Sequence, residues 1–158
     1  MSSKVVLIHA DTRDVHAQAV AKCLSELHVP SRILPRDRCF MDWSISCDDD
    51  EVIVQADGME TWTTDHIRSV LWRRDFIIEP AWVRWDEISP AVAKFLAEQR
   101  SIHVDCAFKR LTASLPFINN LDANRKSDSK VLQHHVARQC GLNVPKTYVG
   151  SDPIRAGK

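Results

Sequence analysis

Hydrophobic residues near the start of the chain follow first the pattern of a buried strand and then that of an amphipathic helix. Residues 4–10 are rich in valine and isoleucine and alternate little, which is typical of a parallel strand buried on both faces. Apolar residues then recur at helical spacing from Val15 to Leu27, and we expect Asp11 and Thr12 to cap this helix. Residues 31–34 predict a second, parallel strand, so the chain opens with a βαβ unit.

The middle of the chain reads as an antiparallel meander followed by a core strand. Residues 43–47, 52–55 and 59–63 alternate apolar and polar side chains, and Asp57-Gly58 is a strong hairpin turn. The acidic run 48–51 separates the first two of these strands. We interpret it as a solvated turn, because oxygen-ligand metal sites space their acids around a loop that contains glycine. Residues 69–72 then predict a buried strand.

The last part of the chain predicts two helices, each followed by a short strand. Ser89-Pro90 starts the first helix, which is expected to end near Leu111. A strand at 116–119 precedes the second helix, which we expect Ser127 or Asp128 to cap. Gly141 ends that helix, Leu142 closes its cap hydrophobically, and residues 147–150 predict a final strand. The apolar residues expected on the buried sides of the two helices are Val92, Phe95, Leu96, Ile102 and Cys106 in the first and Val131, Leu132, Val136 and Cys140 in the second.

This order of elements predicts an α/β fold. We expect one open, mostly parallel, Rossmann-like sheet flanked by helices, with the antiparallel meander inserted. The first turn, HADTRD, has no glycine, whereas a dinucleotide-binding loop needs glycines so that the backbone can approach a pyrophosphate. A nicotinamide or flavin site at this turn is therefore excluded.

Charge and composition limit the kinds of binding partner and the cellular compartment that we expect for this protein. The 158 residues contain 21 Lys plus Arg and 21 Asp plus Glu, so the net charge is zero and there is no general attraction to nucleic acid or to a membrane surface. The apolar runs are far shorter than the about 20 residues that a membrane helix needs. The amino terminus shows no cleavage site of a signal peptide. The five cysteines form no CxxC pair, so we expect a cytoplasmic protein whose cysteines are small core residues.

Two arginines, Arg73 and Arg74, follow the buried strand in the sequence SVLWRRDF. Ligands of open α/β sheets gather beyond the carboxyl ends of the strands, and an arginine there can hold a phosphate or carboxylate with two hydrogen bonds. Successive residues of a strand point to opposite faces, so both arginines are not expected to serve one site. The alternative is that one arginine pairs with a local acid such as Asp75 or Glu79 while the other lies on the surface.

Three other groups of residues have a functional and an ordinary interpretation. His9 and Asp11 could form a catalytic pair, although a contact between a helix cap and a histidine is more ordinary. His134 and His135 are adjacent on a helix, so they diverge by about 100° and cannot chelate one metal as residues four apart would. The aromatic stretch 76–85, which contains Trp82 and Trp85, could form an interface with further domains or with a second copy of the chain, although packing over the sheet edge is the simpler use.

The last forty residues carry a resemblance to a known family. The segment FINNLDANRKSDSKVLQHHVARQCGLNVPKTYVGSDP resembles the lead into the catalytic part of ATP-grasp ligases. In that pattern an asparagine follows a short strand, a lysine opens a helix, and L…A…GL.(I/V)P.T follows. The matching positions here are Asn119 or Asn120, Lys130, Leu132, Ala137, Gly141-Leu142, Val144, Pro145 and Thr147. The Trp72-Arg73-Arg74 strand also looks like that of the graspetide or microviridin group, which cross-links ribosomally made peptides.

This resemblance implies an ATP-dependent ligase that joins a side-chain carboxylate to a hydroxyl or amine of the same peptide. Residues 1–120 would be its pre-ATP-grasp domain, and residues 121–158 the lead-in toward the ATP-grasp catalytic domain. The implied cofactors of the full-length enzyme are ATP and magnesium. The lysine on a β-hairpin, the adenine hinge and the magnesium ligands of the family have no counterpart among these residues, so we expect the fragment to bind no cofactor and to be inactive alone.

The resemblance also places Lys130 on the nucleotide side. A cation in the first turn of a helix opposes the helix dipole unless an anion lies nearby, and a phosphate would satisfy both the lysine and the helix terminus. The alternative is an exposed lysine that points to Asp122 or to solvent. The implied partners are the missing ATP-grasp domain, a precursor peptide and, as a possibility, a second copy of the chain, with no nucleic acid and no membrane.

Two other function classes compete with the ligase domain. The first is a stand-alone, non-catalytic binding or assembly module with the same fold. The second is a small flavodoxin-like regulator, which the meander and the lack of an acidic cluster at the strand ends disfavour.

Overall fold

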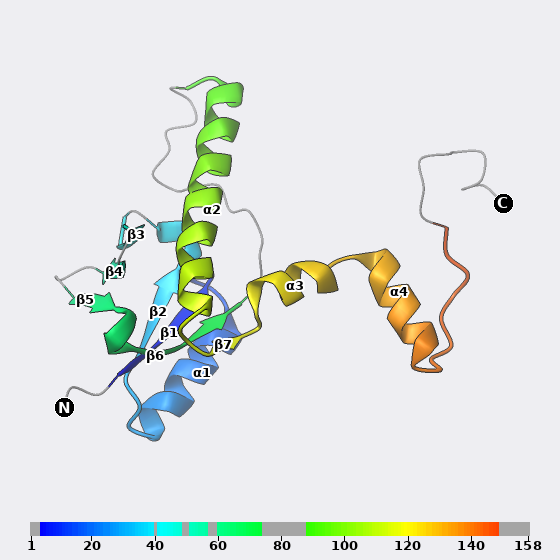
Figure 1. The fold of residues 1–158 in the computed structure, drawn as a ribbon, viewed down its shortest axis with the longest axis horizontal. Coiled ribbons are helices and arrows are strands. Elements are labelled where there is room, and N and C mark those ends of the chain that lie inside the picture. The colour runs from blue at the N-terminus through cyan, green and yellow to red at the C-terminus, as the bar shows by residue number, and fades with distance from the viewer. Residues whose placement is uncertain (1–3, 40, 49–50, 57–59, 74–87, 149–158) are drawn as a thin grey trace. The chain divides into compact units, whose positions relative to one another are not determined.

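The computed structural model describes residues 4–39, 41–48, 51–56, 60–73 and 88–148. The chain forms two compact units, residues 1–121 and residues 122–158. The elements of the first unit are β1 (Val5–Ala10), α1 (Val15–Glu26), β2 (Ser31–Pro35), a 3₁₀ turn (Arg36–Arg38), β3 (Trp43–Cys47), β4 (Val52–Ala56), β5 (Glu60–Thr63), a second 3₁₀ turn (Thr64–His66), β6 (Ile67–Trp72), α2 (Pro90–Thr112) and β7 (Phe117–Ile118). Helix α3 (Leu121–Ser127) begins at the boundary, and α4 (Lys130–Gln139) belongs to the second unit (Figure 1).

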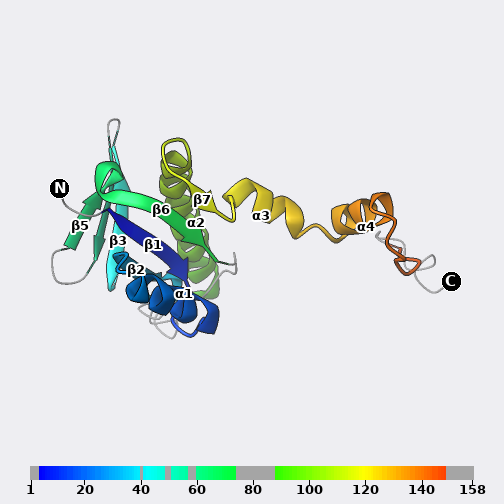
Figure 2. The same cartoon turned by 90° about the horizontal axis from the view of Figure 1, so that it is seen from below.

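The first unit contains two sheets. Strands β2, β1, β6 and β7 pair in this order and all are parallel, which confirms the predicted α/β fold and its parallel sheet. Strands β3, β4 and β5 pair antiparallel, as the meander predicts. The expectation of one sheet is wrong in this detail, because the meander forms a separate three-stranded sheet (Figure 2).

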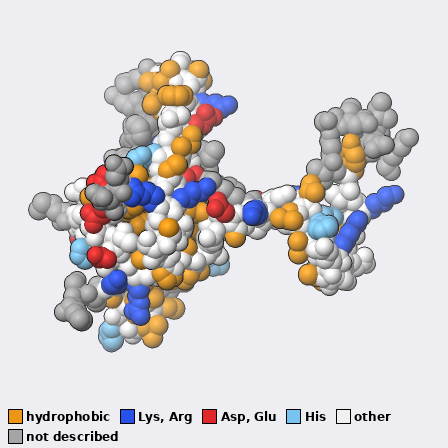
Figure 3. Space-filling view, in the orientation of Figure 1, with side chains coloured by type: hydrophobic (Ala, Val, Ile, Leu, Met, Phe, Trp, Pro, Cys, Tyr) orange, Lys and Arg blue, Asp and Glu red, His pale blue; other side chains and the backbone are white. Residues whose placement is uncertain are grey.

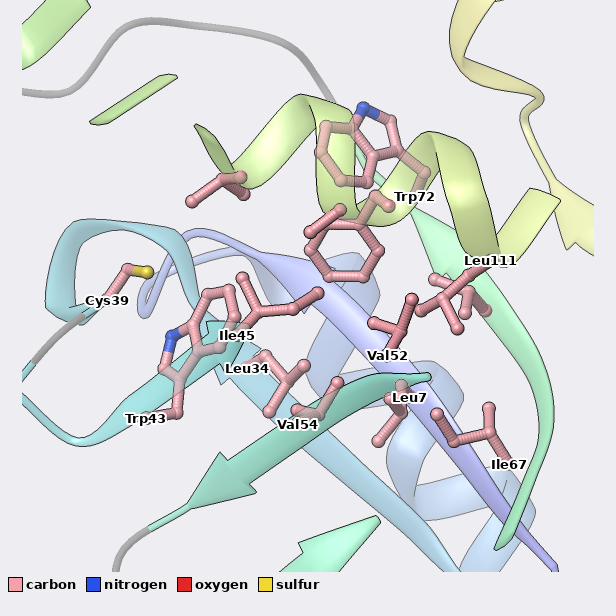
Figure 4. Close-up of a cluster of buried hydrophobic side chains, with 14 of the residues drawn as sticks. Leu7, Leu34, Cys39, Trp43, Ile45, Val52, Val54, Ile67, Trp72 and Leu111 are labelled. Atoms are coloured by element: carbon pink, nitrogen blue, oxygen red, sulfur yellow. The ribbon is translucent and has the colours of Figure 1, made fainter. Parts of the chain in front are cut away.

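Alternate residues of β1 pack on opposite faces of the parallel sheet. Val6, Ile8 and Ala10 lie with Ala17 of α1 in one buried cluster. Leu7 lies on the other face, in a larger cluster with side chains of α2, β3 and β4 (Figure 4). The strand is therefore covered on both sides, which explains its nearly continuous hydrophobic run.

The helix caps differ from the predicted ones at two of three helices. Asp14, rather than Asp11 or Thr12, caps α1, and its Oδ1 accepts hydrogen bonds from the backbone N–H groups of residues 16 and 17. Ser89 caps α2 with Pro90 as the first helical residue, as expected. Ser129, rather than Ser127 or Asp128, caps α4. The short helix α3, which ends at Ser127, was not predicted, and it moves the next cap along the chain.

The predicted buried face of α2 is wrong. Val92, Phe95, Leu96 and Ile102 are 39–58% exposed, and Cys106 is exposed too. The helix instead buries a different set of side chains, namely Ala93, Val104, Ala107, Phe108 and Leu111. Each set recurs at helical spacing, and the sequence pattern alone favoured the wrong one.

In the second unit, no described residue of α4 is buried, so the predicted buried side of this helix is also wrong. The helix ends as predicted at Gly141, which has φ +74°. The N–H of Leu142 donates to the carbonyl of Ala137 over 2.9 Å, as in a Schellman cap. Leu142 remains 62% exposed, so its hydrophobic closure of the cap is not found. Residues 147–148 belong to no strand, and 149–150 lie outside the described residues.

All five cysteines are free, but only Cys39 is buried. The interpretation of the cysteines as core residues is therefore wrong for Cys23, Cys47, Cys106 and Cys140. The described residues include no helix with the length and hydrophobicity needed to cross a membrane.

Candidate functional site

Strands β1, β2, β6 and β7 end at one edge of the parallel sheet, and the residues that follow them form the candidate site. Because the four strands are parallel, their carboxyl ends meet at the same edge. Open α/β sheets bind ligands at this edge. The residues that follow β6 and β7 include Arg73 and Asn119, and Asp14 caps the helix that follows β1.

Arg73 extends the pairing of β6 with β1 and turns its side chain toward α1. Its backbone N–H donates to the carbonyl of His9 over 3.0 Å. Its Nε lies 3.4 Å from Oδ2 of Asp14. The Asp14 side chain is 8% exposed and that of Arg73 is 24% exposed, so the pair lies at the border of the core and still reaches solvent.

Asp14 serves the helix and the arginine at once, since its Oδ1 caps α1 and its Oδ2 faces Arg73. Burial raises the pKa of this carboxyl group, but the backbone hydrogen bond from Ala17 and the positive charge of Arg73 outweigh burial and hold the pKa below its ordinary value. The site therefore contains a carboxylate that keeps its charge and fixes a guanidinium group.

This contact corrects part of the alternative in which one of the two arginines pairs with an acid close to it in the sequence. Arg73 does pair with an acid, but the acid is Asp14, which lies 59 positions away in the sequence rather than next to it. Arg74, Asp75 and Glu79 lie outside the described residues. The anion-binding role of Arg73 and Arg74 therefore stays a prediction.

His9 lies inside the core and not at the surface of the site. It is 3% exposed, and its ring stacks on Trp72 with centroids 4.1 Å apart. Phe108 and Trp43 flank the same ring at 5.0 and 5.5 Å. The carboxylate of Asp11 accepts a hydrogen bond from the backbone of Arg13. The structure therefore gives His9 and Asp11 separate roles, neither of them the predicted catalytic pair or cap contact.

The buried His9 ring is held neutral. Burial lowers its pKa well below the ordinary value, and the positive charges of Arg36 and Arg100 lower the pKa further. Its Nδ1 and the indole Nε1 of Trp72 are buried and have no hydrogen-bond partner among the residues that the structure describes. A buried polar atom without a hydrogen bond lowers the free energy of unfolding. The close packing of this aromatic cluster is therefore partly offset by its two unpaired nitrogen atoms.

Basic residues also surround the end of β2. Arg100 of α2 donates from Nη2 to the carbonyl of Arg36 over 2.7 Å, which joins the helix to the turn after β2. The indole Nε1 of Trp43 donates to the carbonyl of Pro35 over 2.6 Å. Both contacts fix the turn that carries the Arg36 charge near His9.

Asn119 closes the end of β7 in the left-handed region, with φ +61°. Its Nδ2 donates to the carbonyl of Trp72 over 3.0 Å, which satisfies the last residue of β6. Asparagine tolerates this backbone conformation better than most residues do. Asn119, one of the two asparagines that the family pattern allows at this position, therefore lies at the carboxyl edge of the sheet through this contact.

Lys130 is the first residue of α4 in the second unit. Its Nζ donates to Oε1 of Gln133 over 3.0 Å, and the residue is exposed. This contact differs from the predicted alternative, in which Lys130 points to Asp122. Nothing tests its nucleotide-binding role, which stays a prediction.

A surface pocket of about 310 Å³ lies beside α4, within the second unit. Its lining residues are Val131, His134, His135, Arg138 and Thr147. His134 Nε2 lies 3.1 Å from the hydroxyl of Thr147, so the helix and the segment after it contact each other here. The two histidines therefore border one pocket despite their divergence on the helix. The described residues contain no cluster of three or more His, Cys, Asp and Glu side chains that could hold a metal ion.

Two of these features have sequence signals that were missed. Asp14 directly precedes Val15, the first residue of the helical hydrophobic pattern, which is the position that an N-cap prefers. His9 shares the face of Leu7 by strand alternation, so its burial follows if that face is covered. The contact between Arg73 and Asp14 has no local signal, because it depends on the pairing of β1 with β6.

Comparisons with known proteins concern the fold. No family model matches the chain, and no curated protein matches its sequence. Among solved structures, the macrocyclase MdnB from Microcystis aeruginosa MRC is similar with a TM-score of 0.81 and 20% identity, over 98% of this chain and 50% of that chain.

Two solved complexes are also similar. A RiPP-associated ATP-grasp ligase from Chryseobacterium gregarium, in complex with ADP and a leader and core peptide, has a TM-score of 0.71 and 19% identity, over 97% of this chain and 46% of that chain. The ATP-grasp ligase PsnB, complexed with a minimal precursor, Mg and ADP, has a TM-score of 0.71 and 18% identity, over 96% of this chain and 48% of that chain. The chain therefore has the fold found in about half the length of these ligases, as its sequence predicted.

Proposed function

We propose that the chain is the amino-terminal domain of an ATP-dependent ligase that joins side chains of a ribosomally made peptide. Its fold, shared with half of several peptide-modifying ATP-grasp ligases, supports this function. The observation that carries the proposal is the Arg73 guanidinium, which Asp14 holds at the carboxyl edge of the parallel sheet. Such a domain would supply one wall of the active site and would act in the cytoplasm.

The reaction class requires groups that bind anions. In such a ligase the γ-phosphoryl group of ATP passes to a side-chain carboxylate, and a hydroxyl or amine of the same peptide then displaces phosphate to form an ester or amide. The carboxylate, the acyl phosphate and the released phosphate are all anions. Arginine binds each of them well, because its planar guanidinium can donate two parallel hydrogen bonds.

Arg73 is prepared for this role by the contacts around it. Its backbone is tied to His9, and its Nε faces Asp14. A guanidinium group has five N–H donors. One contact through Nε therefore leaves N–H groups on the two terminal nitrogens that can donate to a ligand. A held arginine loses less conformational entropy when it binds, which favours recognition of a substrate carboxylate. Arg74 lies outside the described residues, so these contacts single out Arg73 alone.

Lys130 would contribute to the nucleotide side. It stands in the first turn of α4, where a phosphate would interact favourably with both the ammonium group and the helix terminus. To do so it would exchange its contact with the neutral Oε1 of Gln133 for one with an anion, which is the stronger type of hydrogen bond.

ATP and magnesium would bind mainly outside the described residues. These residues include no acid cluster suited to a metal, and magnesium prefers carboxylate oxygens together with substrate phosphates. We therefore propose that a further ATP-grasp domain supplies the magnesium ligands and that a precursor peptide is the substrate. By itself the 158-residue chain is proposed to hydrolyse no ATP. Submicromolar affinity for ATP in titration calorimetry of the chain alone would contradict the proposal that ATP binds mainly to a further domain.

The experiment that tests the site compares turnover and stability in a protein that joins this chain to its ATP-grasp domain. Arg73→Ala should lower kcat/KM by a factor that corresponds to roughly 2–5 kcal/mol, because the substrate anion would lose its cation. The variant also leaves Asp14, whose side chain is 8% exposed, without its arginine, so some fall in the melting temperature is expected as well. Arg13→Ala is the matched control, since Arg13 is 93% exposed and also pairs with an acid, Asp11. If Arg73→Ala only lowers the melting temperature and leaves turnover unchanged, the anion-binding role is wrong.

A stand-alone binding or assembly module is the second candidate. Exposed apolar side chains in both units favour it, among them Phe95 at 58% and Val131 at 56%. The coding region after Lys158 separates the two candidates. A continuing frame that encodes a lysine-bearing β-hairpin and downstream acids supports the ligase, and a stop codon supports the module.

A further inference from the structure

The second unit contains a stretch of positive charge that no acid of the same stretch offsets. Acids make up 21 of the 158 residues of the chain, but residues 129–148 contain none. This stretch contains two histidines and three basic residues, Lys130, Arg138 and Lys146. On the side of α4 that Figure 3 presents, histidine and Lys or Arg side chains are seen, and no acidic side chain lies among them. A local excess of positive charge in a chain of zero net charge attracts anions.

The pocket beside α4 gathers part of this charge. Its volume of about 310 Å³ is at the lower end of the range for sites that bind small molecules. Its described lining consists of Val131, His134, His135, Arg138 and Thr147. Three of these side chains can carry a positive charge and none can carry a negative charge. The described lining therefore suits an anion.

Two of the lining side chains are available to a ligand. In the part of the chain that the structure describes, neither the His135 ring nor the Arg138 guanidinium has a hydrogen bond or an ion pair. The two residues are three positions apart on α4, which makes them neighbours on the helix surface. A guanidinium can donate two parallel hydrogen bonds, and an imidazole N–H can donate another.

The other two polar residues of the lining bind each other. The hydroxyl of Thr147 donates to the carbonyl of Pro145 over 3.1 Å. The Thr147 oxygen therefore accepts from Nε2–H of His134, which lies 3.1 Å away. This contact joins α4 to the segment after it and fixes one wall of the pocket. It leaves His135 and Arg138 unused.

We propose that this pocket is a phosphate-binding site, in which Arg138 and His135 donate hydrogen bonds to the phosphate oxygens. Phosphate fits the site better than a carboxylate does, because it carries more negative charge and has more acceptor oxygens. Lys130 and Lys146, which belong to the same acid-free stretch, add attraction at longer range.

The site is separate from the position at which the resemblance places the nucleotide. Lys130 is the first residue of α4, whereas Arg138 lies in its last turn. The two residues are eight positions apart, which corresponds to about 12 Å along a helix. The inference goes beyond the proposed function and does not rest on it.

The helix dipole explains only a part of these observations. A cation in the last turn of a helix interacts favourably with the dipole, and Arg138 has this position. The effect of the dipole falls off within that turn, so it explains neither the lack of acids from 129 to 148 nor the unpaired ring of His135.

The first experiment titrates the 158-residue chain with inorganic phosphate and follows its backbone amide signals by NMR. About 0.1 M salt is present to screen long-range attraction. We expect saturable shifts within residues 131–147 and a dissociation constant on the order of 1 mM, since the ligand is small. Arg138→Gln should raise this constant at least about tenfold, because it removes a charge and two paired donors.

Lys146→Gln is the matched control. It removes one charge from the same acid-free stretch, but Lys146 does not belong to the described lining of the pocket. We expect it to raise the dissociation constant less than about twofold, because salt screens a charge that does not touch the ligand. His135→Gln should have an intermediate effect of about threefold, since it removes one donor.

The second experiment compares inorganic phosphate with acetate and with ADP. Acetate should bind at least about tenfold more weakly, because it has a single charge and two oxygens. ADP distinguishes two sources of the phosphate group. Shifts of the same amides at the affinity of inorganic phosphate assign the site to the phosphate group alone, and at least about tenfold tighter binding assigns it to a nucleotide.

The outcomes are decisive in both directions. Saturable binding that Arg138→Gln weakens and Lys146→Gln leaves nearly unchanged supports the proposal. Equal weakening by these two variants overturns it, because the attraction is then a diffuse effect of the charge. A lack of shifts within residues 131–147 up to about 20 mM phosphate, or equal binding of acetate, also overturns it.

A further variant keeps the test valid if Arg138→Gln disturbs the helix, which circular dichroism would show. Arg138→Lys keeps the positive charge and a good helix former but loses the two parallel N–H groups. We expect it to weaken phosphate binding at least about threefold. Unchanged affinity in Arg138→Lys, with the helix signal kept, would overturn the role of the guanidinium.

Discussion

The two units of the chain are stabilised in different ways. All the buried hydrophobic side chains that the structure describes lie between Val5 and Leu121, where strands far apart in the sequence pack against α2. In the second unit, every described residue from 122 to 148 whose exposure is known is half-buried or exposed. The contacts described within this unit include the Ser129 cap, the Gly141 cap and the contact of His134 with Thr147. A ten-residue helix without a buried face is marginal in water.

The largest difference between the units should appear when an apolar side chain is truncated. Phe108→Ala removes a fully buried ring from the first unit and should lower its free energy of unfolding by about 3–5 kcal/mol. Val136→Ala, at a residue that is 45% exposed in the second unit, should change stability by less than about 0.5 kcal/mol. Urea unfolding followed by tryptophan fluorescence measures the effect in the first unit, which contains all five tryptophans of the chain, and far-ultraviolet circular dichroism follows the helix signal that includes α4. Equal effects would show that the second unit has a core of its own.

The pH dependence of stability should also belong to the first unit. His9 has a lowered pKa when folded, chiefly because it is buried, and about 6.5 when unfolded, so below about pH 6.5 the unfolded state binds more protons. The free energy of unfolding should then fall by up to about 1.4 kcal/mol per pH unit until the folded pKa is reached, and it should be flat with respect to His9 above about pH 6.5.

Urea titrations at several pH values between about 7 and 5 test this expectation, with His9→Leu as the comparison. The variant should lose most of the slope. An identical slope in both proteins would show that His9 is not the group responsible.

Loss of a helix cap should have a smaller effect, with different consequences in the two units. Asp14→Ala removes the cap of α1 and the partner of Arg73, and should lower the stability of the first unit by about 0.5–2 kcal/mol. Asp14→Asn should recover the capping part of this loss, because asparagine caps well but carries no charge. Ser129→Ala should reduce the helix signal in circular dichroism without moving the unfolding midpoint of the first unit.

A more local effect is expected at Gly141. An added Cβ meets no atom within 4 Å, so Gly141→Ala costs only the strain of a left-handed backbone, about 1 kcal/mol. We expect faster amide hydrogen exchange at Leu142, whose N–H closes the cap, and unchanged exchange in the first unit. Unchanged exchange at Leu142 would show that this cap contributes little to α4.

The sequence predicted the elements better than the surfaces they bury. Strand β1 and the meander were found because their hydrophobic patterns match one structure each. In α2, Val92, Phe95 and Ile102 form a pattern as regular as that of Val104 and Phe108, and periodicity cannot say which face meets the core. In α4, the pattern of Val131 and Val136 indicated a buried face that nothing in this unit covers.

The candidate site was predicted only as far as local sequence allows. The Arg73 position follows from the strand before it, and its place at the carboxyl edge follows from the parallel sheet. Its partner Asp14 and the burial of His9 depend on contacts between segments about sixty positions apart, which composition and spacing do not reveal.

One backbone hydrogen bond joins the interior of the first unit to its candidate site. The carbonyl of His9 accepts from the N–H of Arg73, while the His9 ring stacks on Trp72, the residue before Arg73. A substitution that moves the His9 ring within the core would therefore also reach the peptide group that positions Arg73. The packing of one buried ring and the placement of a surface arginine are in this way set by the same two residues of neighbouring strands.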